Sequence, residues 1–180
     1  MEYLDIVDEY GEPTGRVAER SVVHLEGLPH RTSHVWLVRK REQGVEILLQ
    51  RRSLEKDCFP GDYDISSAGH IPAGQGYPDS ALRELREELG VEAGEEDLVF
   101  CGDFHIKNES IFHGEPFRDD VYSRVFYMWK DLETEAFTIQ KSEISEVRWI
   151  GLDECIRLSD EGEMPCLFPQ ELQMLKKALG

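Results

Sequence analysis

Three glutamates in the middle of the chain are spaced so that one face of a helix would carry all of them. Glu84, Glu87 and Glu88 fall at positions i, i+3 and i+4 of the run Arg-Glu-Leu-Arg-Glu-Glu. Like charges at such spacings destabilise an isolated helix by roughly 0.2–0.5 kcal/mol per pair. Clustered hard oxygen donors suit Mg²⁺ or Mn²⁺, whose shells are completed by water and phosphate oxygens. The pattern therefore predicts a divalent-metal site that receives a phosphate-containing ligand.

A glycine-rich loop leads into this helix. The stretch Gly69-His70-Ile71-Pro72-Ala73-Gly74-Gln75-Gly76 runs from a predicted strand to the helix start. Glycines at such a place let the backbone approach a ligand closely. The alternative is a solvated helix face on which Arg83 pairs with Glu87. The loop favours the metal site.

The segment from Gly69 to Val91 resembles the Nudix box, G-x5-E-x7-R-E-U-x-E-E-x-G-U, in which U is an aliphatic residue. The single departure is Gln75, which stands where the family has its first glutamate. A neutral side chain there can still form hydrogen bonds but contributes no charge, and this bears on the reaction rate and on the number of metals bound.

The resemblance implies a role for each matching residue. The helix carboxylates Glu84, Glu87 and Glu88 would bind Mg²⁺ or Mn²⁺, helped by a backbone carbonyl of Ala68 or Gly69. Arg83 would organise the glutamates by pairing with them. The fold implied is an α/β fold, a Nudix-type α/β/α sandwich with a mixed β-sheet.

A second resemblance, over roughly residues 3–155, is to the Nudix branch that is similar to type I isopentenyl-diphosphate isomerase. It is carried by the runs Leu-Gln-Arg-Arg-Ser-x-x-Lys at 49–56 and Phe-Pro-Gly-x-Tyr-Asp at 59–64. By position, the resemblance implies that Arg52 and Lys56 bind the substrate diphosphate. Two cations beside a bound metal would let an acidic protein hold a polyanion. The alternative is two exposed surface cations. Gln75 is the third expected substrate-binding residue.

The same resemblance implies a weaker alternative metal site at His24, His30 and His70. Isomerases hold a metal with three histidines, and neutral imidazoles suit transition metals. Against this site, the interval from His24 to His30 is one residue shorter than in the isomerases, and His34 is a nearby competitor. The sequence also places His24 and His30 in a polar loop.

Isomerisation would require a cysteine just before the Gly-His pair, where this chain has Ala68. Isomerases also typically have an eroded glutamate helix, which is intact here. The expected function is therefore cleavage of a diphosphate linkage in a small nucleoside- or other diphosphate-containing metabolite. Two alternatives stay open: an isomerase-like enzyme that uses a different acid, and a non-catalytic module that senses a nucleotide.

Hydrolysis also needs a group that accepts the proton of the attacking water. A helix glutamate or an acid from a later loop could do this. The loop candidates are Glu143 and Glu146, which precede Val147, with Asp119 and Asp120 behind them. In so acidic a chain, an ordinary surface acid is the alternative for each.

Hydrophobic patterning predicts the elements that hold these residues. Helices are expected at about 79–89, ended by Gly90, and at 169–179. The expected strands cover 3–7, about 16–19, 35–38, 45–49, 63–67, 98–104, 121–129 and 146–150. Residues 108–120 are expected to form a variable loop. The domain prediction is a single Nudix domain, 1–180, with an N-terminal β-hairpin extension of about residues 1–30.

Composition limits the partners. A formal net charge of −17 over 180 residues makes nucleic acid an unexpected partner, since duplex binding relies on broad neutralisation of phosphates by Lys and Arg. Four cysteines without a C-x-x-C pair predict neither a zinc ribbon nor a disulfide framework, so a reduced, cytoplasmic chain is expected. No stretch approaches the roughly 18 apolar residues of a membrane span. A homodimer is compatible with the sequence but not required by it.

Overall fold

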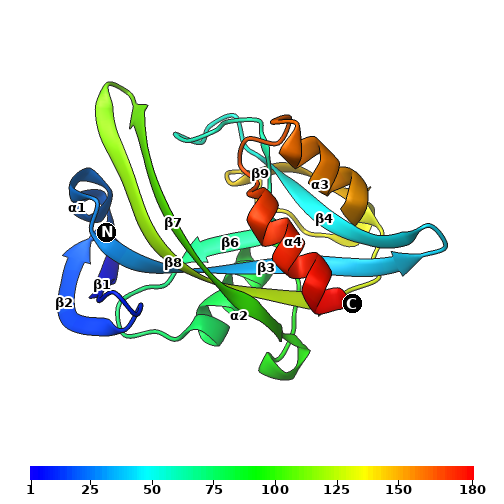
Figure 1. Cartoon of the computed structure of the whole chain (residues 1–180), viewed down its shortest axis with the longest axis horizontal. Coiled ribbons are helices and arrows are strands. Elements are labelled where there is room, and N and C mark those ends of the chain that lie inside the picture. Colours follow the sequence, from blue (N-terminus) through cyan, green and yellow to red (C-terminus); the bar gives the residue numbers. More distant parts are fainter.

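The computed structural model describes residues 1–180 and is built around one mixed β-sheet of seven strands (Figure 1). Its strands are Pro29–Arg41 (β3), Gly44–Arg52 (β4), Tyr63–Asp64 (β5), Ser67–His70 (β6), Val99–Phe112 (β7), Glu115–Trp129 (β8) and Ile144–Gly151 (β9). The main path runs β5-β4-β3-β8-β7, while β6 pairs with β3 and β9 pairs with β4. Only β3 and β8 are parallel neighbours.

Helices cover both faces of this sheet. Successive residues of β3 alternate between the two faces, as the two-residue period of a strand requires. Val35 and Leu37 pack in one apolar core beneath the helix Tyr77–Leu89 (α2). Trp36 and Val38 pack in the other, beneath Leu152–Asp160 (α3) and Pro169–Leu179 (α4). These three layers confirm the predicted α/β/α sandwich with a mixed sheet.

A separate hairpin lies at the N-terminal end of the chain. Strands Tyr3–Val7 (β1) and Pro13–Glu19 (β2) pair antiparallel, and the helix Arg20–Glu26 (α1) follows. The backbone N–H of Ala73 donates to the carbonyl of Tyr3 at 2.8 Å, and Gly74 N–H donates to Asp5 at 2.8 Å. The hairpin thereby holds the loop that connects β6 to α2.

The sheet opens along one edge of β3. Residues 38–41 of β3 pair with β4, whereas residues 32–35 pair with β6. The other edge of β3 is occupied by β8, so β4 and β6 share one edge and must diverge from each other. This divergence lets side chains from α2, beneath the sheet, reach the opposite face.

The predicted helix around Glu84 is confirmed and begins two residues earlier than expected, at Tyr77. It ends at Leu89, and Gly90 adopts the left-handed conformation (φ 66°) expected after a helix end. The closing helix matches 169–179, and the strand predictions for 3–7, 35–38, 45–49 and 121–129 are also confirmed.

Other element predictions were wrong. Residues 108–120 are not a loop, because β7 and β8 stay paired from Val99↔Tyr127 to Phe112↔Glu115 and turn only at His113-Gly114. The predicted strand 63–67 is broken after Asp64, whose carboxylate accepts the N–H of Ile65. The helices α1 and α3 were not predicted, and neither were the short 3₁₀ turns Glu95–Asp97 and Thr134–Ala136.

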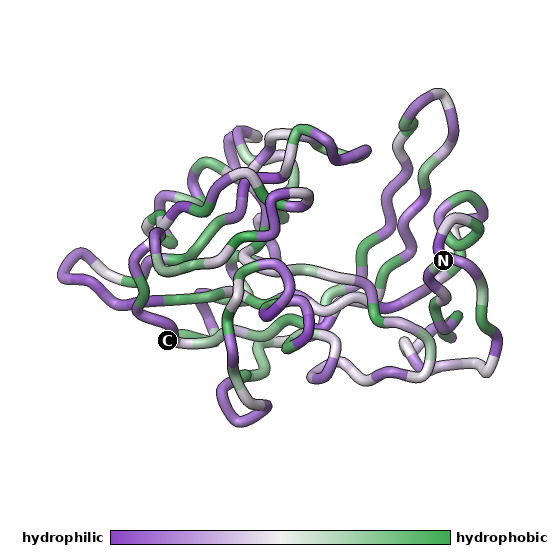
Figure 2. Tube along the Cα trace, turned by 180° about the vertical axis from the view of Figure 1, so that it is seen from behind, coloured by the Kyte–Doolittle hydropathy of each residue, from purple (hydrophilic) through white to green (hydrophobic).

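Hydropathy along the chain follows this architecture. Figure 2 shows hydrophobic segments in the central strands and hydrophilic segments at the hairpin tips. None of the helices combines the length and the apolar character needed to cross a bilayer.

The packing of α2 predicts a contrast between two leucines. Leu85 is fully buried against the sheet, whereas Leu82 is only half-buried. Leu85→Ala is expected to lower the free energy of unfolding by about 2–5 kcal/mol, through lost burial and an unfilled cavity. Leu82→Ala should cost about 1 kcal/mol. Urea denaturation measures both, and equal losses would contradict this packing.

Candidate active site

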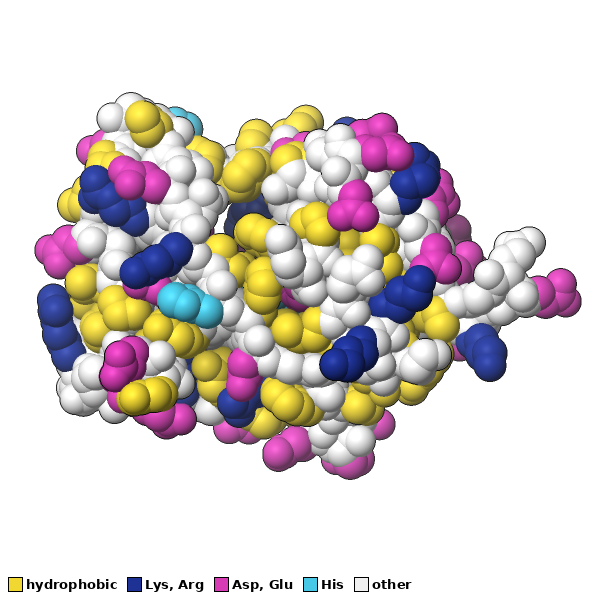
Figure 3. Space-filling model, in the orientation of Figure 1, with side chains coloured by type: hydrophobic (Ala, Val, Ile, Leu, Met, Phe, Trp, Pro, Cys, Tyr) yellow, Lys and Arg dark blue, Asp and Glu magenta, His cyan; other side chains and the backbone are white.

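A cavity of about 450 Å³ lies where β4 and β6 diverge. One face of β3, β7 and β8 forms its floor, residues 165–168 form one wall, and the glutamates of α2 stand at the β6 side. Figure 3 shows the surface hollowed between the β7–β8 hairpin and the part that carries α3 and α4, with hydrophobic side chains around the hollow. The cavity is of the size that small-molecule sites have.

All three helix glutamates reach this cavity, but their surroundings differ. Glu87 is exposed, Glu84 is half-buried and Glu88 is buried. The Glu88 Oε2 accepts hydrogen bonds from Ser67 Oγ at 3.1 Å and from Gln50 Nε2 at 3.3 Å. Burial, together with the smaller effect of the nearby Glu84 charge, raises the pKa of Glu88 to about 8. Burial also raises the pKa of Glu84, against the opposing effect of Arg83.

The backbone of β6 touches the glutamate helix directly. A Cβ placed on Gly69 would lie 2.5 Å from the Glu84 Cδ and 2.7 Å from its Oε1, so even a methyl group at this position would have to displace the Glu84 side chain. Gly69 and its neighbour Ala68 both line the cavity. Backbone and carboxylate oxygens therefore stand close together at one end of it.

Arg83 and Gln75 form the outer side of this arrangement. Arg83 donates from Nη2 to Glu84 Oε1 and from Nη1 to Gln75 Oε1, both at 2.8 Å. Arg83 thus pairs with Glu84 and not with Glu87. Gln75 is exposed, and neither Gln75 nor Arg83 lines the cavity. The amide of Gln75 still gives Arg83 an acceptor, although an uncharged one.

The two cations expected to hold phosphate both line the cavity and both contact acids. Arg52 donates from Nη1 to Asp64 Oδ2 and from Nε to the Cys58 carbonyl, each at 2.9 Å. Lys56 forms an ion pair with Glu143. Glu143 therefore stands at the cavity beside a cation, in the turn before β9.

The cavity as a whole carries excess negative charge. Its acidic residues are Glu2, Asp64, Glu84, Glu87, Glu88, Asp119 and Glu143, against the basic Arg20, Arg52 and Lys56. Such a site repels a bare polyanion. Bound divalent cations would remove the mismatch, and carboxylate and carbonyl oxygens are the donors that Mg²⁺ and Mn²⁺ prefer. The residues present therefore fit such a metal.

Of the other acidic candidates, Asp119 lines the cavity and lies 3.3 Å from His24 Nε2, whereas Glu146 and Asp120 lie elsewhere. Glu146 is on β9 rather than in a loop, outside the cavity lining, and accepts a hydrogen bond from the Tyr63 hydroxyl. Asp120 does not line the cavity and contacts His105 at 2.6 Å and Lys107 at 3.2 Å.

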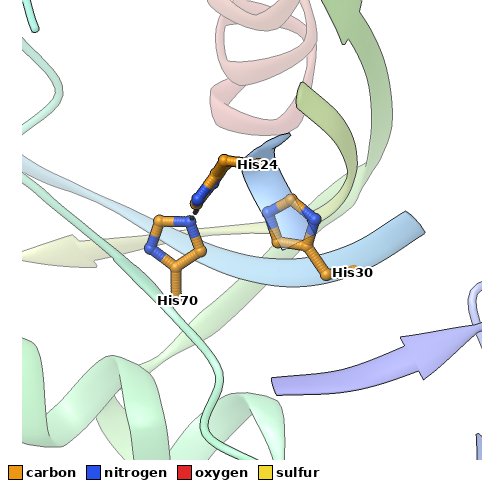
Figure 4. Close-up of side chains that lie close together, drawn as sticks. All are labelled: His24, His30 and His70. Atoms are coloured by element: carbon orange, nitrogen blue, oxygen red, sulfur yellow. Dashed lines mark hydrogen bonds between the residues drawn. The ribbon is translucent and has the colours of Figure 1, made fainter. Parts of the chain in front are cut away.

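The three histidines of the alternative metal site lie together, as Figure 4 shows. Their ligand atoms all fall within 4.8 Å of one another, and the Nε2 atoms of His24 and His70 are 3.2 Å apart. His24 is on α1 and His30 on β3, and both are buried. The expectation that these two lie in a polar loop was wrong.

Backbone carbonyls orient two of these rings. His24 Nδ1 lies 2.9 Å from the Arg20 carbonyl, and His30 Nδ1 lies 2.8 Å from the Leu28 carbonyl. The buried Nε2 of His30 has no partner in the protein. Burial lowers the pKa of His30 to about 4 and that of His70 well below its ordinary value, so both rings are neutral at pH 7. Neutral imidazoles with Nδ1 held by a carbonyl are typical of metal ligands.

The sequence reasoning missed several residues of the site. Gln50 and Ser67, which contact Glu88, come from β4 and β6, far from α2 in the chain. A signal was available, because Gln50 and Asp64, the partner of Arg52, both lie in the runs 49–56 and 59–64 that carry the second resemblance. No role was inferred for either residue.

A family model for the NUDIX domain matches residues 28–169. The chain belongs to the NUDIX domain family. Nudix hydrolase 3 of Arabidopsis thaliana is 40% identical over 157 residues, which are 85% of this chain but only 20% of that longer protein. An uncharacterized Nudix hydrolase of Clostridium acetobutylicum is 36% identical over 159 residues, which are 88% of this chain and 74% of the relative. Both relatives are named as Nudix hydrolases.

Solved structures share the fold of this Nudix domain. A Deinococcus radiodurans protein has a TM-score of 0.67 at 23% identity, with 89% of this chain and 90% of that chain covered. The Nudix domain of Shewanella oneidensis NrtR, complexed with ADP ribose, has a TM-score of 0.57 at 19% identity, with 83% and 88% covered. The Ap4A hydrolase of C. elegans, as a binary complex, has a TM-score of 0.55 at 20% identity, with 83% and 96% covered.

The contact at Gly69 predicts the effect of adding one methyl group. Gly69→Ala is expected to displace Glu84 and to weaken Mn²⁺ binding by about 10- to 100-fold, as loss of a supporting contact does in metal sites. Gly76→Ala is the matched control, because a Cβ there would meet nothing closer than 3.9 Å. Electron paramagnetic resonance of free Mn²⁺ measures both affinities. Equal affinities in the two variants would show that Glu84 does not bind the metal.

The raised pKa of Glu88 predicts a pH-dependent stability in the metal-free Nudix domain. Between the ordinary pKa of 4.5 and the folded value of about 8, the folded state keeps a proton that the unfolded state has lost. The parent should therefore lose stability relative to Glu88→Gln as pH rises through this interval, by up to about 1.4 kcal/mol per pH unit. Urea denaturation in EDTA at pH 5 to 8.5 measures the difference, and parallel curves would refute it.

Proposed function

We propose that this Nudix domain hydrolyses a diphosphate linkage in a small nucleoside- or other diphosphate-containing metabolite, with Mg²⁺ or Mn²⁺ as cofactor. The proposal rests on one observation: the three helix glutamates line the same cavity as Arg52 and Lys56, two cations suited to binding phosphate. Glu84, Glu87 and Glu88, with a backbone carbonyl of Gly69 or Ala68, would hold the metal. A divalent ion there supplies Lewis-acid stabilisation of the charge that develops on the diphosphate.

Other side chains position the metal ligands and bind the diphosphate. Ser67 and Gln50 fix the carboxylate of Glu88, and Arg83 fixes that of Glu84. Arg52 and Lys56 bind diphosphate oxygens, and Asp64 holds Arg52 in position. Pre-positioned charges of this kind stabilise a transition state without reorganising during the reaction.

For the general base, the geometry favours Glu143 over Glu146. Glu143 lines the cavity, whereas Glu146 lies outside it and contacts Tyr63. A phosphate that attracts Lys56 would release Glu143 from its ion pair and leave that carboxylate free to accept a proton.

The organic part of the substrate is proposed as a nucleoside or a group of similar size. The cavity volume is about 450 Å³, large enough for more than a diphosphate alone. The structural neighbours from Shewanella oneidensis and C. elegans are described with ADP ribose and with Ap4A hydrolase activity, and both molecules are nucleotides. A product screen over nucleoside di- and triphosphates, sugar nucleotides, dinucleotide cofactors and prenyl diphosphates identifies the substrate.

A second candidate function is isomerisation of isopentenyl diphosphate. The observation in its favour is the cluster of His24, His30 and His70, which would hold a transition metal. Ala68 argues against it, because an alanine supplies no thiol for proton transfer at carbon. Proton NMR of isopentenyl diphosphate incubated with the protein in D₂O decides: deuterium incorporation supports isomerisation, and an unchanged spectrum eliminates it.

The metal assignment predicts which glutamates matter. Glu87→Gln should lower kcat for Mg²⁺-dependent diphosphate cleavage by about 100- to 1000-fold, because the substitution removes a charged metal ligand while the exposed position leaves folding intact. Glu92→Gln is the control, since Glu92 is exposed and lies just beyond the helix, outside the cavity lining. Initial rates at saturating Mg²⁺ measure both. A Glu87→Gln rate near that of the parent would show that Glu87 is not a metal ligand.

A further inference from the structure

The floor of the cavity carries a row of polar side chains that have no role in the proposed cleavage of the diphosphate. Thr32 and His34 of β3 and Ser123 of β8 all line the cavity. The hydroxyl oxygens of Thr32 and Ser123 are 2.7 Å apart, and His34 Nε2 lies 3.4 Å from Thr32 Oγ1. Ile106 and Val121 line the floor beside these groups, and the polar Asn108 and Ser110 of β7 also line the cavity. Thr32, His34 and Ser123 therefore form one connected polar cluster on a floor of mixed polarity.

A buried carboxylate on α4 orients His34. Glu171 approaches His34 Nδ1 with both oxygens, at 2.9 and 3.1 Å, and its side chain is 1% exposed. Trp36 Nε1 donates to the same carboxylate at 3.0 Å. With Nδ1 committed to Glu171, the free ring nitrogen is Nε2, on the side of Thr32 and Ser123. Its 3.4 Å contact with Thr32 is longer than a good hydrogen bond, so Nε2 keeps the capacity to bind another group.

A purely structural role explains only part of this arrangement. Burying a carboxylate and an imidazole costs free energy, and apolar residues of similar size often hold two elements together at least as well. Trp36 alone would anchor Glu171 without an imidazole in the cavity wall. Burial by itself would lower the pKa of His34, but the charge and hydrogen bond of Glu171 outweigh it and hold the pKa above its ordinary value. Glu171 therefore fixes the ring in the orientation that turns Nε2 toward Thr32.

The sheet register places His34 beside the diphosphate end of the cavity. His34 pairs with Ala68 across β3 and β6, one residue pair from Ser33↔Gly69. A substrate whose phosphates lie near Glu84 and Gly69 would extend its organic half over the floor that includes His34 and Ser123.

We propose that His34 is a specificity-determining residue whose Nε2 forms a hydrogen bond with a hydroxyl group on the organic half of the substrate, and that Glu171 is its positioning residue. This inference rests on the proposed function, since it assumes a diphosphate bound at the glutamate helix. Sites built to bind a substrate oxygen discriminate strongly against analogues that lack it. A hydrocarbon over the floor would leave Nε2 without a hydrogen-bond partner on the substrate.

Two probes that each contain a diphosphate group test the proposal. Both are methylene-bridged and resist hydrolysis: an ADP-ribose analogue, rich in oxygen, and an isopentenyl analogue, whose organic half is hydrocarbon. Calorimetric titration with Mg²⁺ gives each Kd. The parent should bind the ADP-ribose analogue at least about 10-fold more tightly. His34→Ala should weaken that binding by about 10- to 100-fold and the isopentenyl analogue less than about threefold.

Three further variants separate recognition from folding. Glu171→Gln should reduce the preference, because its amide no longer holds Nδ1 as a charged acceptor does. His34→Gln keeps an N–H donor and should restore part of the preference; it also carries the test if His34→Ala does not fold. Trp36→Phe is the matched control, since it removes a donor to Glu171 but leaves the His34 contact, so the ratio of the two affinities should stay at the parent value.

The outcomes distinguish failure of the His34 role from failure of the proposed function. If His34→Ala weakens both probes equally, or neither, His34 does not determine specificity, although the diphosphate site stands. The same holds if the parent binds both probes equally well. If neither probe binds the parent in the presence of Mg²⁺, the proposed function fails and the role of His34 fails with it.

Discussion

The backbone of Gly69 and the carboxylate of Glu84 meet with no room for a side chain between them. This contact places the carboxylate of Glu84 directly against β6, and the proposed metal site depends on that position. Leu85 and Leu89 hold the helix from the apolar side, buried against the sheet. The loop between β6 and α2 is held in turn by the N-terminal hairpin through Ala73. Because β4 and β6 diverge, the charged side of the helix reaches the cavity on the other face.

The same geometry creates an electrostatic problem. Carboxylates from α2, β5, β8 and the turn before β9 gather at one cavity, and one of them, Glu88, is buried. Mutual repulsion and burial both favour neutral forms of such groups, as the pKa of Glu88 near 8 illustrates. Divalent cations resolve the conflict and give an acidic protein a way to hold a polyanion. Arg52 and Lys56, each paired with an acid, then add direct contacts to phosphate.

Local pattern made the glutamate helix predictable, since its leucine spacing, the glutamate spacing and Gly90 all lie within one short segment. Contacts between residues that are far apart in the sequence were not predictable in the same way. Ser67 and Gln50 meet Glu88 only through the sheet, and His24, His30 and His70 converge from three elements. The β7–β8 hairpin was mistaken for a loop at 108–120, because strands with mostly half-exposed residues show no clear apolar alternation. Short α1, with no side-chain cap, gave no helix signal.

The central claim is that the cavity holds a diphosphate only once divalent cations offset its carboxylates. The most direct measurement is calorimetric titration of the methylene-bridged ADP-ribose analogue into the parent protein, first in EDTA and then at stepwise increasing Mg²⁺. The charge excess at the cavity predicts no detectable binding in EDTA and an apparent Kd that tightens as Mg²⁺ rises, until the metal sites are full. Binding of equal strength in EDTA and in Mg²⁺ would contradict the account.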